Sequence, residues 1–417
     1  MSTDNHYDVI VIGGGPSGMM AAGCAGSRGR KVLLLEKNGD LGRKLSLTGG
    51  GRCNILNAEE DGKVLLDQYG DSKKFLYSPF SKFGMNDTWN FFEDRGLPLV
   101  VEARKRAFPK SQRAEDVIKT MISFMKDGRV EIKAGVSVKE IKNDGDRVVS
   151  VETELGSFTA DNFVLATGGT SYPDTGSTGE GLKWLKEIGH TVKSSGPNLV
   201  PLAVKERWVK DLSGVTLSFM RITFGADRKK KEGKFSRLGK ILFTHFGLSG
   251  PLILNSSQKV KDLLKDGPVK AEIDMYPDTD LNDLRKRVLN TFERNRNKDL
   301  KNAIHEVAPA GMGDVITETL FPEMPDRKVH SISKEERESI CDIMKSMPLT
   351  VTGTMGLDRA IASDGGVDLS EVDTKTMRSK VLNNLYLTGD VLDIDRPSGG
   401  FSLQWCWTSG WVAGSNV

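Results

Sequence analysis

Three glycines at a fixed spacing form the motif with the clearest chemical meaning. Gly13, Gly15 and Gly18 make a G-x-G-x-x-G pattern between the apolar stretch YDVIVI (7–12) and a helical stretch. The first glycine of such a pattern allows a tight turn, the second lets the backbone approach a pyrophosphate, and the third lets helix and strand pack closely. The helix N-terminus then offers N–H groups and a positive dipole end to the phosphates. The pattern therefore predicts a dinucleotide site.

An acidic residue at the end of the next strand supports this interpretation. The apolar stretch KVLLLE ends at Glu36, which completes a strand–helix–strand unit. A carboxylate at this position accepts hydrogen bonds from ribose hydroxyls. The same glycine spacing also occurs in ordinary turns between a strand and a helix. Because the strand, the helix and the terminal acid are all present in order, we favour dinucleotide binding over a simple turn.

The C-terminal segment distinguishes between the candidate dinucleotides. The stretch NNLYLTGDV (383–391) is a predicted strand that runs into Asp390. A carboxylate there can bind the hydroxyls of a ribityl chain, which FAD contains and NAD lacks. A further predicted helix begins at Gly399–Ser402, and its positive N-terminal end would stabilise the negative charge of a reduced flavin. We expect non-covalently bound FAD rather than FMN, because Gly13–Gly18 and Glu36 address an ADP half that FMN lacks.

A loop with three consecutive glycines is expected beside this cofactor. The stretch LSLTGGGRCNILN (45–57) fits neither a helix nor a strand, and its glycines indicate a backbone that passes close to the ligand. Arg43, Lys44 and Arg52 flank the glycines and can neutralise phosphates or a substrate anion. Cys53 has no C-x-x-C partner, so we favour a packed thiol over a redox-active one.

Two shorter glycine-rich turns complete the set. The stretch LATGG (165–169) ends an apolar strand and predicts a third approach of the backbone to the same cofactor. The stretch GSTGEG (176–181) leads into a predicted helix. A simple helix entry and a cofactor contact explain its glycines equally well.

The composition is that of an ordinary globular protein. The 417 residues are 38% hydrophobic and 28% charged, with a formal net charge of +3. This balance gives no electrostatic reason to expect nucleic acid or a membrane surface as a partner. We predict that the basic run DRKKKEGK (227–234) is a solvated hairpin loop, and we expect a small-molecule substrate.

Targeting and metal-binding signals are lacking in the sequence. The N-terminus has no basic region followed by a long apolar stretch, and no run of about 18 apolar residues occurs, so neither a signal peptide nor a transmembrane helix is expected. The four cysteines are widely spaced and the five histidines are scattered. This pattern predicts neither a disulfide framework nor a metal site, and it favours a reducing, cytoplasmic location.

The pattern along the chain predicts an interrupted α/β domain. Residues 1–193 and 347–417 share strand-and-glycine character and are assigned to one domain. Apolar alternation predicts a β-barrel-like insert over 194–279, and amphipathic patterns predict a small helical domain over 280–346. Within the first domain, residues 130–166 are expected to form a small antiparallel meander.

Two patterns carry the helical prediction. Leu281, Leu284, Val288 and Phe292 share one face of a helix. Ser333, followed three residues later by a glutamate, begins a second helix with a capping box.

Several motifs together resemble one known family. They are GRKLSLTGGGRCNILN, ATGGTSYPDTGSTGEG, FTHFGLSGPLIL, GGVDLSEVDTKTMRSK and LYLTGDVLDIDRPSGGFSLQWCWTSGWVAG. In these the chain resembles the BaiN-like family of NAD(P)/FAD-dependent oxidoreductases, which includes aminoacetone-oxidase-like and dehydro-bile-acid-reductase members. The resemblance runs from about residue 7 to 414. It implies a three-layer, Rossmann-like FAD domain of the glutathione-reductase type, interrupted by a β-barrel domain and a small helical domain.

The resemblance also implies which residues contact FAD. One departure from the family is the loop TGGGRCN, where many relatives have Asn or His between the glycines, so a substrate contact assigned to that side chain does not carry over. Val136 is implied to contact adenine through its backbone. The complete implied set is Gly13, Gly15, Pro16, Ser17, Gly18, Glu36, Lys37, Arg43, Lys44, Thr48, Gly49, Gly50, Gly51, Arg52, Cys53, Asn54, Val136, Thr167, Gly168, Gly169, Gly389, Asp390, Gly399, Gly400, Phe401 and Ser402.

These features predict an FAD-dependent oxidoreductase. It would transfer hydride between flavin N5 and a small-molecule or steroid-like substrate, for example as a reductase of an activated C=C bond. Only one G-x-G-x-x-G pattern is present, so NAD(P)H would act as a transient co-substrate over the flavin. The alternatives are a flavin-dependent amine oxidase, a flavin-dependent nucleic-acid-modifying enzyme and a flavin-binding redox sensor without turnover.

The candidate catalytic residues come from the family motifs. Tyr172 and His245 are candidate proton donors, because each lies in a glycine-bounded motif. A strand-end histidine bonded to backbone explains His245 equally well. Arg396 is a candidate for guarding the pyrimidine edge of the flavin or for binding a substrate anion.

Overall fold

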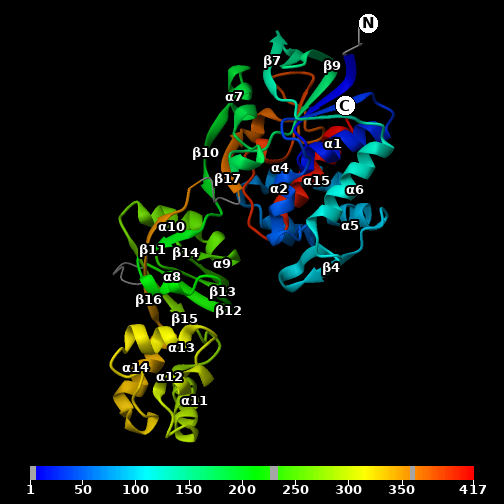
Figure 1. The fold of residues 1–417 in the computed structure, drawn as a ribbon. Helices are drawn as coiled ribbons and strands as arrows, with labels where there is room; N and C mark the ends of the chain where they lie inside the picture. Colours follow the sequence, from blue (N-terminus) through cyan, green and yellow to red (C-terminus); the bar gives the residue numbers. More distant parts are fainter. Residues whose placement is uncertain (1–5, 226–232, 357–361) are drawn as a thin grey trace. The chain divides into compact units, whose positions relative to one another are not determined.

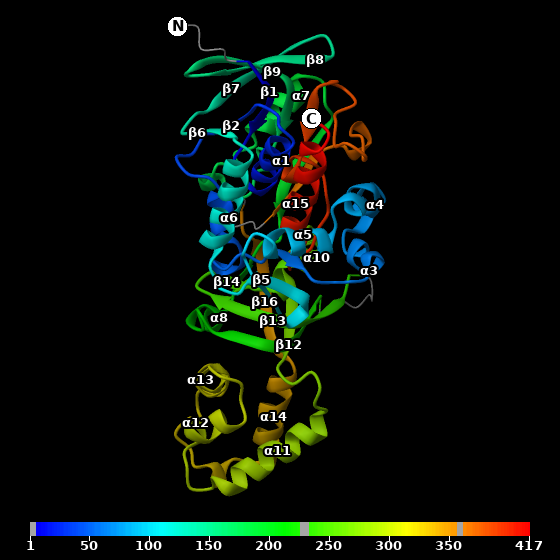
Figure 2. The same cartoon turned by 90° about the vertical axis from the view of Figure 1, so that its right-hand side faces the viewer.

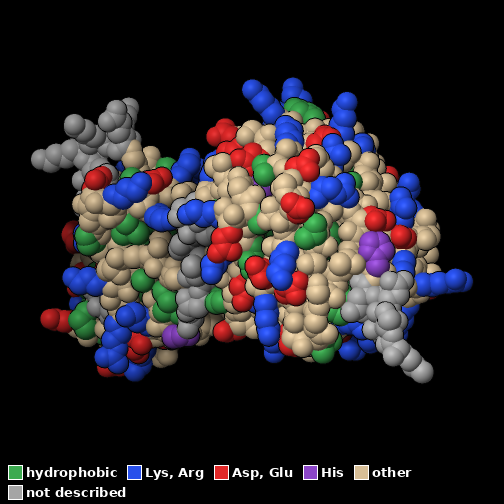
Figure 3. All heavy atoms as spheres, turned by 90° about the horizontal axis from the view of Figure 1, so that it is seen from above, with side chains coloured by type: hydrophobic (Ala, Val, Ile, Leu, Met, Phe, Trp, Pro, Cys, Tyr) green, Lys and Arg blue, Asp and Glu red, His purple; other side chains and the backbone are tan. Residues whose placement is uncertain are grey.

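The computed structural model describes residues 6–225, 233–356 and 362–417 (Figure 1). The chain divides into two compact units, residues 1–197 with 360–417 and residues 198–359. Most of the basic run predicted to be a solvated hairpin loop, 227–234, lies outside the described residues. On the face drawn in Figure 3, lysine and arginine side chains are interspersed with aspartate and glutamate, as the near-neutral composition predicts.

A seven-stranded sheet organises the first unit, with the order β6-β2-β1-β9-β8-β7 and with β18 paired to β9. Strand β9 is long: its first residues pair with β8 in an antiparallel meander, and its last residues pair in parallel with β1 and β18. The predicted meander is therefore confirmed for β7–β9, whereas β6 pairs in parallel with β2. The bounds are β1 His6–Ile12, β2 Val32–Glu36, β6 Glu131–Ala134, β7 Val138–Asp144, β8 Arg147–Thr153, β9 Gly156–Leu165 and β18 Leu385–Leu387.

Helices and a smaller sheet complete this unit. Helix α1 (Pro16–Ser27) packs against α15 (Phe401–Gly414) and α6 (Ala114–Asp127), and Figure 2 shows α1 and α15 side by side. The small antiparallel sheet has the order β3-β5-β4. The remaining bounds are α2 Arg43–Leu47, β3 Leu56–Asn57, α3 Gly62–Asp67, α4 Lys73–Lys82, α5 Met85–Glu93, β4 Leu99–Glu102, β5 Arg106–Pro109 and α7 Glu180–Glu187.

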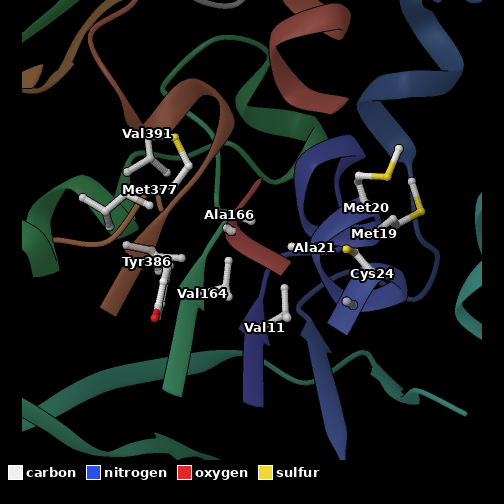
Figure 4. Packing of buried hydrophobic residues seen from close by; sticks show 14 of the residues in the cluster. Val11, Met19, Met20, Ala21, Cys24, Val164, Ala166, Met377, Tyr386 and Val391 are labelled. Atoms are coloured by element: carbon white, nitrogen blue, oxygen red, sulfur yellow. The ribbon is translucent and has the colours of Figure 1, made fainter. Parts of the chain in front are cut away.

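The core of this unit joins segments from both ends of the chain. Figure 4 shows Val164 of β9 between Val11 of β1 and Tyr386 of β18, with Ala21 and Cys24 of α1 on the other side of Val11. Strands β1 and β2 are almost continuously apolar and buried, as expected for parallel strands covered on both faces. The pairing of β18 with β9 makes the C-terminal segment part of the sheet, which confirms the predicted interrupted domain.

The second unit contains a closed, six-stranded antiparallel barrel with the order β11-β14-β13-β12-β15-β16. Its strands are β11 Leu202–Val204, β12 Thr216–Phe224, β13 Phe235–Thr244, β14 Gly247–Ser249, β15 Val269–Asp274 and β16 Met347–Thr354. The barrel helices are α8 Arg207–Asp211, α9 Pro251–Leu254 and α10 Ser257–Leu264. Two paired strands, β10 (Val192–Asn198) and β17 (Ala362–Val367), lie where the chain enters and leaves this unit.

The helical part of the second unit follows the barrel in Figure 1. It contains α11 Leu281–Arg294, α12 Leu300–Ala303, α13 Met312–Asp314 and α14 Lys334–Lys345. The predicted apolar face of α11 buries Leu284, Val288 and Phe292, and the predicted capping box of Ser333 and Glu336 begins α14. Both helix predictions are thus confirmed, although Leu281 is only half-buried.

Two predicted domain boundaries need correction. Residue 347 was expected to return the chain to the α/β domain, but Met347–Thr354 is barrel strand β16, paired with β15 and β11. The barrel and the helices also share one hydrophobic core, so they form one unit rather than two. The ammonium of Lys345 strengthens their connection by donating to Asp274 Oδ2 at 2.8 Å and to the carbonyls of Tyr276 and Thr279 at 2.9 Å. None of the helices in the described ranges is long and apolar enough to cross a membrane.

The contact between α1 and α15 depends on two glycines. A Cβ atom at Gly410 would lie 2.4 Å from the carbonyl oxygen of Ser17, and one at Gly414 would lie 2.4 Å from that of Ala21. We predict that Gly410→Ala lowers the free energy of unfolding by about 1–3 kcal/mol, because the methyl group forces the two helices apart. Urea unfolding followed by circular dichroism measures this loss.

Gly62→Ala is the matched control. Gly62 begins α3, and a Cβ atom there would meet no atom within 4 Å. We expect this variant to be as stable as the unchanged protein or slightly more stable. Equal stability of both variants would contradict the proposed close packing of α1 on α15.

Candidate functional site

The first part of the site is the turn between β1 and α1. Gly13 has a φ of 107°, and a Cβ atom there would lie 2.5 Å from the Ala166 carbonyl oxygen. A Cβ atom at Gly18 would lie 1.9 Å from the Gly13 carbonyl oxygen, whereas one at Gly15 would meet nothing within 4 Å. Two of the glycines are therefore needed for packing, and the third borders open space. This arrangement matches the requirements for backbone approach to a pyrophosphate.

The N-terminus of α1 is available at the same place. No side chain in the described part of the protein caps the helix, Pro16 occupies its first turn and the N-cap residue is Gly15. Ser17 and Gly18 are buried within this turn. The helix therefore directs backbone N–H groups and its positive dipole end toward the open side of Gly15.

Glu36 is fixed beside the glycine turn. Its side chain is 8% exposed, and its carboxylate accepts hydrogen bonds from the backbone N–H groups of Gly14 at 2.7 Å and Asn38 at 2.8 Å. The amide of Asn38 adds a third bond at 2.7 Å. These bonds hold the carboxylate at the end of β2, as predicted for a group that binds ribose hydroxyls.

Residues around Glu36 connect this end of the sheet to the turn 175–181. Lys37 Nζ donates to Thr178 Oγ1 at 2.9 Å and to Glu180 Oε2 at 2.8 Å. Arg43 Nη1 donates to Asn38 Oδ1 at 3.1 Å. The backbone N–H of Val136 is bonded to the Glu36 carbonyl at 2.9 Å, so an adenine contact by Val136 would use other backbone atoms.

The third predicted turn, Thr167–Gly169, follows β9. Gly168 has a φ of 74°, which favours glycine. The hydroxyl oxygen of Thr167 is buried and has no hydrogen-bond partner among the residues that the structure describes. Since buried polar groups are normally satisfied, this hydroxyl is a candidate for a ligand contact.

Lys44 and Arg43 point to different parts of the site. Whereas Arg43 reaches Asn38, Lys44 Nζ lies 3.2 Å from the hydroxyl of the fully buried Ser171. Burial lowers the pKa of Lys44, and the nearby Asp390 partly opposes this effect. Lys44 thus places a half-buried ammonium group near Asp390.

Asp390 and Arg396 form a buried ion pair. Arg396 Nη2 lies 2.5 Å from Asp390 Oδ1, and the two side chains are 3% and 17% exposed, respectively. Arg396 also donates to the Ile394 carbonyl at 2.6 Å and to Ser402 Oγ at 3.2 Å. The described contacts therefore give Arg396 the role of holding Asp390 next to the first turn of α15. Its predicted contact with a flavin edge or substrate stays a prediction.

The loop over residues 48–54 meets the start of α15. Gly400, the N-cap residue of α15, has a φ of 100°, and a Cβ atom there would lie 2.3 Å from the Leu56 carbonyl carbon. The side-chain amide of Asn54, oriented with its oxygen toward Gly400, accepts a bond from that N–H at 2.9 Å. Asn57 Nδ2 donates to the Gly399 carbonyl at 3.1 Å. These contacts fix both predicted flavin-binding loops against each other.

The other members of these loops divide into packed and open positions. A Cβ atom at Gly50 or at Gly51 would meet no atom within 4 Å, so the backbone there borders open space. Thr48 Oγ1 donates to the Leu45 carbonyl at 2.8 Å, and the Phe401 carbonyl accepts a bond from Tyr69 at 2.8 Å. Burial raises the pKa of Cys53 to about 12, which agrees with a packed, unreactive thiol.

Arg52 is already engaged by protein groups. Its Nη1 atom lies 2.9 Å from Glu102 Oε1 and 2.8 Å from Gln112 Oε1. Its guanidinium carbon lies 4.1 Å from the centre of the Phe108 ring. A role in neutralising phosphates, as predicted, would require Arg52 to exchange these contacts.

The two candidate proton donors lie in different units. Tyr172 follows Ser171 and has a φ of 50°, an uncommon backbone conformation for a residue other than glycine. Its carbonyl accepts a bond from the Thr175 N–H at 2.9 Å. His245 is exposed in the turn between β13 and β14, with its ring centre 4.9 Å from that of Phe246. These contacts do not test either catalytic assignment.

A buried Ser–His–Glu group was not predicted from the sequence. His190 Nδ1 lies 2.8 Å from Glu371 Oε2, and His190 Nε2 lies 2.9 Å from Ser379 Oγ. This resembles the geometry of a hydrolytic triad, but Ser379 is 1% exposed and also accepts bonds from two backbone N–H groups. The group therefore connects the end of α7 to the segment before β18. Residues so far apart in the sequence give no local signal of this contact.

The charge state of His190 gives a pH-dependent prediction. Burial lowers the pKa of His190 below its ordinary value of 6.5, although Glu371 opposes the shift. As pH falls below about 6.5, the unfolded chain therefore binds a proton that the folded protein excludes, and stability decreases. We expect the thermal midpoint to fall between pH 7 and 5, with a smaller fall for His190→Asn. If the thermal midpoint of His190→Asn fell as steeply with pH as that of the unchanged protein, His190 would not cause the pH dependence.

The Asp390–Arg396 pair gives a prediction about stability. In cofactor-free protein, Asp390→Ala should lower the free energy of unfolding by about 3–5 kcal/mol, because it leaves the buried Arg396 unpaired. The double variant Asp390→Ala/Arg396→Met should regain part of that loss, which urea unfolding measures. Arg396→Met alone is measured as well. A double variant whose loss equals the sum of the losses of Asp390→Ala and Arg396→Met would show that the two charges do not interact.

Full-length relatives carry enzyme names. The chain is 28% identical, over 97% of both chains, to the 3-dehydro-bile acid delta(4,6)-reductase of Clostridium scindens. It is 26% identical to the ribosomal RNA dihydrouridine synthase of Escherichia coli, over 99% of this chain and 98% of that one. Both names describe reductive enzymes, in agreement with the predicted oxidoreductase class.

Solved structures share the fold. The 3-ketosteroid delta1-dehydrogenase from Sterolibacterium denitrificans has a TM-score of 0.56 at 13% identity, covering 98% of this chain and 99% of that chain. A model of the HI0933-like protein Rossmann domain matches residues 7–416. The predicted Rossmann-type fold and the resemblance given by the motifs are confirmed, and the chain belongs to the HI0933-like Rossmann domain family.

Proposed function

We propose that this protein is an FAD-dependent oxidoreductase that reduces a carbon–carbon double bond conjugated with a carbonyl group, with NAD(P)H as the electron donor. The observation that carries the FAD-binding part of the proposal is the open side of Gly15 between two packed glycines, next to the N-terminus of α1, where the described residues place no side-chain cap. Glu36, Asp390 and the start of α15 extend this site along the carboxyl ends of the parallel strands. Ligands of open α/β sheets bind at that edge.

Each part of FAD has a matching group in the first unit. The pyrophosphate fits the backbone of Gly15–Gly18, and the adenosine ribose fits Glu36. We assign the ribityl chain to Asp390, and the flavin ring to the loop Gly49–Arg52 and the N-terminus of α15. When bound, FAD supplies hydride transfer. The positive helix end of α15 would stabilise negative charge on the reduced ring.

The type of bond reduced is suggested by the two relatives. The name of the Clostridium scindens enzyme describes reduction of ring double bonds in a 3-dehydro bile acid. The name of the Escherichia coli enzyme describes the saturation of a uracil ring. Both substrates contain a C=C bond conjugated with a carbonyl, which accepts a hydride at one carbon and a proton at the other. We propose that Tyr172 or His245 donates the proton to the substrate carbon.

A second candidate is the reduction of uridine in RNA. Relatives in Escherichia coli and Haemophilus influenzae with this name match 99% of the chain at 26% identity. The barrel segment 198–279 also contains more Lys and Arg than Asp and Glu, although the whole chain is nearly neutral. A basic segment of this kind can bind phosphates in a salt-dependent manner. An amine oxidase and a non-catalytic redox sensor have no comparable support.

We predict that the purified protein is yellow and releases FAD, not FMN, on heating. Anaerobic NADH or NADPH should bleach the flavin absorbance, and a conjugated enone should restore it. In parallel, the oxidised protein is mixed with an amine and the reduced protein with oxygen. Bleaching of the flavin by the amine and its rapid recovery with oxygen would support the oxidase alternative. A protein whose flavin is reduced by neither pyridine nucleotide would contradict the proposal and favour a sensor.

The substrate candidates are distinguished by a second comparison. The reduced protein is mixed with a 3-oxo-4-ene steroid or with ribosomal RNA prepared without dihydrouridine. Reoxidation of the flavin by the steroid alone supports the small-molecule substrate. Reoxidation by RNA alone, with dihydrouridine detected by mass spectrometry and steep inhibition by salt, supports the RNA substrate.

A further inference from the structure

A strained turn in the first unit contains an exposed arginine whose backbone is joined to the loop that we assign to the flavin. The turn connects β4 and β5, and Arg104 and Lys105 have φ values of 62° and 56°. The left-handed region is unfavourable for an ordinary residue because its Cβ atom crowds a carbonyl oxygen, and here two such residues follow each other. Strain of this kind persists only where surrounding contacts fix the backbone, and it is frequent at ligand-binding sites.

Several contacts fix this turn to the flavin end of the site. Asn57 Nδ2 donates to the Arg104 carbonyl at 3.2 Å and to the Gly399 carbonyl at 3.1 Å. The Ala58 N–H donates to the Lys105 carbonyl at 2.6 Å. Gly399 directly precedes the N-cap of α15. The backbone of Arg104 is therefore joined through one amide group to the loop that we assign to the flavin.

Among the described residues, the charges around the turn leave one cation without an acidic partner. Arg52 and Arg106 both face Glu102, at 2.9 Å and 4.0 Å, and Lys105 pairs with Glu59 at 2.7 Å. Arg104 is exposed, and within 6–225, 233–356 and 362–417 its guanidinium has no acidic partner. Burial lowers the pKa of Arg106, Glu102 opposes this shift, and the positive charges of Arg52 and Arg104 add to it. The cluster thus has more positive than negative charge.

We propose that Arg104 binds an anionic group of the substrate, a carboxylate or a phosphate, while the conjugated ring lies at the flavin. The guanidinium fork matches the two oxygens of such a group. An anion there would also offset the repulsion among Arg52, Arg104 and Arg106. This inference rests on the proposed function, and it adds that the substrate contains an acidic group outside the reducible ring.

Binding of matched ligand pairs tests the inference without requiring turnover. The FAD-loaded protein is titrated by calorimetry with uridine 5′-monophosphate and uridine, and with a 3-oxo-4-ene steroid acid and its methyl ester. We expect at least one acid to bind about tenfold more tightly than its neutral partner. The pair that shows this preference identifies phosphate or carboxylate as the source of the anion.

Three variants test whether Arg104 causes the tighter binding of the acidic ligand. Arg104→Gln should abolish it while keeping the side-chain length, the strained backbone and the bound FAD. Arg104→Lys should retain only part of it, because the ammonium keeps the positive charge but lacks the two-pronged geometry of the guanidinium. The control is Arg129→Gln, because Arg129 is also exposed with a φ of 54°, but it lies in the turn before β6, at the opposite ends of the parallel strands.

The outcomes are decisive for this inference. A preference that is lost in Arg104→Gln and kept in Arg129→Gln supports it. Equal binding of acid and neutral partner by the unchanged protein, binding of no ligand, or a preference that survives Arg104→Gln would overturn it. The proposed reductase function fails separately, if NAD(P)H does not reduce the flavin or no conjugated double bond reoxidises it.

Discussion

The close contact between the β1–α1 turn and the end of β9 is the constraint on which the rest of the site depends. Because Gly13 lies against the Ala166 carbonyl and Gly18 lies against Gly13, α1 begins directly at the sheet edge. Helix α15 then packs on α1 through Gly410 and Gly414, which brings the C-terminal segment to the same edge. A side chain at any of these positions would collide with backbone atoms. The positions of Glu36, Asp390 and Gly400 follow from this packing.

Much of the first unit could be predicted from sequence because its signals are local. Apolar strands, a glycine turn and a terminal acid follow one another within about thirty residues, and each has a defined physical role. The barrel was also predictable from alternation, but its last strand was not, since Met347–Thr354 pairs with strands more than seventy residues away. Local alternation does not reveal which sheet a strand joins.

The side-chain partners in the site were the least predictable part. Arg43, Lys44 and Arg52 were expected to serve one purpose, yet the structure directs them to Asn38, Ser171 and Glu102. Arg396 is used to neutralise Asp390. The buried contact of His190 with Glu371 and Ser379 joins residues about 180 positions apart. Sequence patterns predict which types of residue are present, whereas the partner of a long charged side chain depends on tertiary packing.

The difference between a backbone held by packing and an exposed side chain explains how one fold can serve different substrates. The backbone that we assign to FAD is held by packing, so changes at Gly13, Gly18 or Gly400 would disturb the fold itself. The side chain of Arg104 is exposed, and its turn is fixed through backbone atoms by Asn57. A different residue there would alter the charge presented to a substrate while leaving the cofactor-binding framework intact. A change of substrate preference through Arg104 would therefore cost much less stability than a change of cofactor preference through the packed glycines.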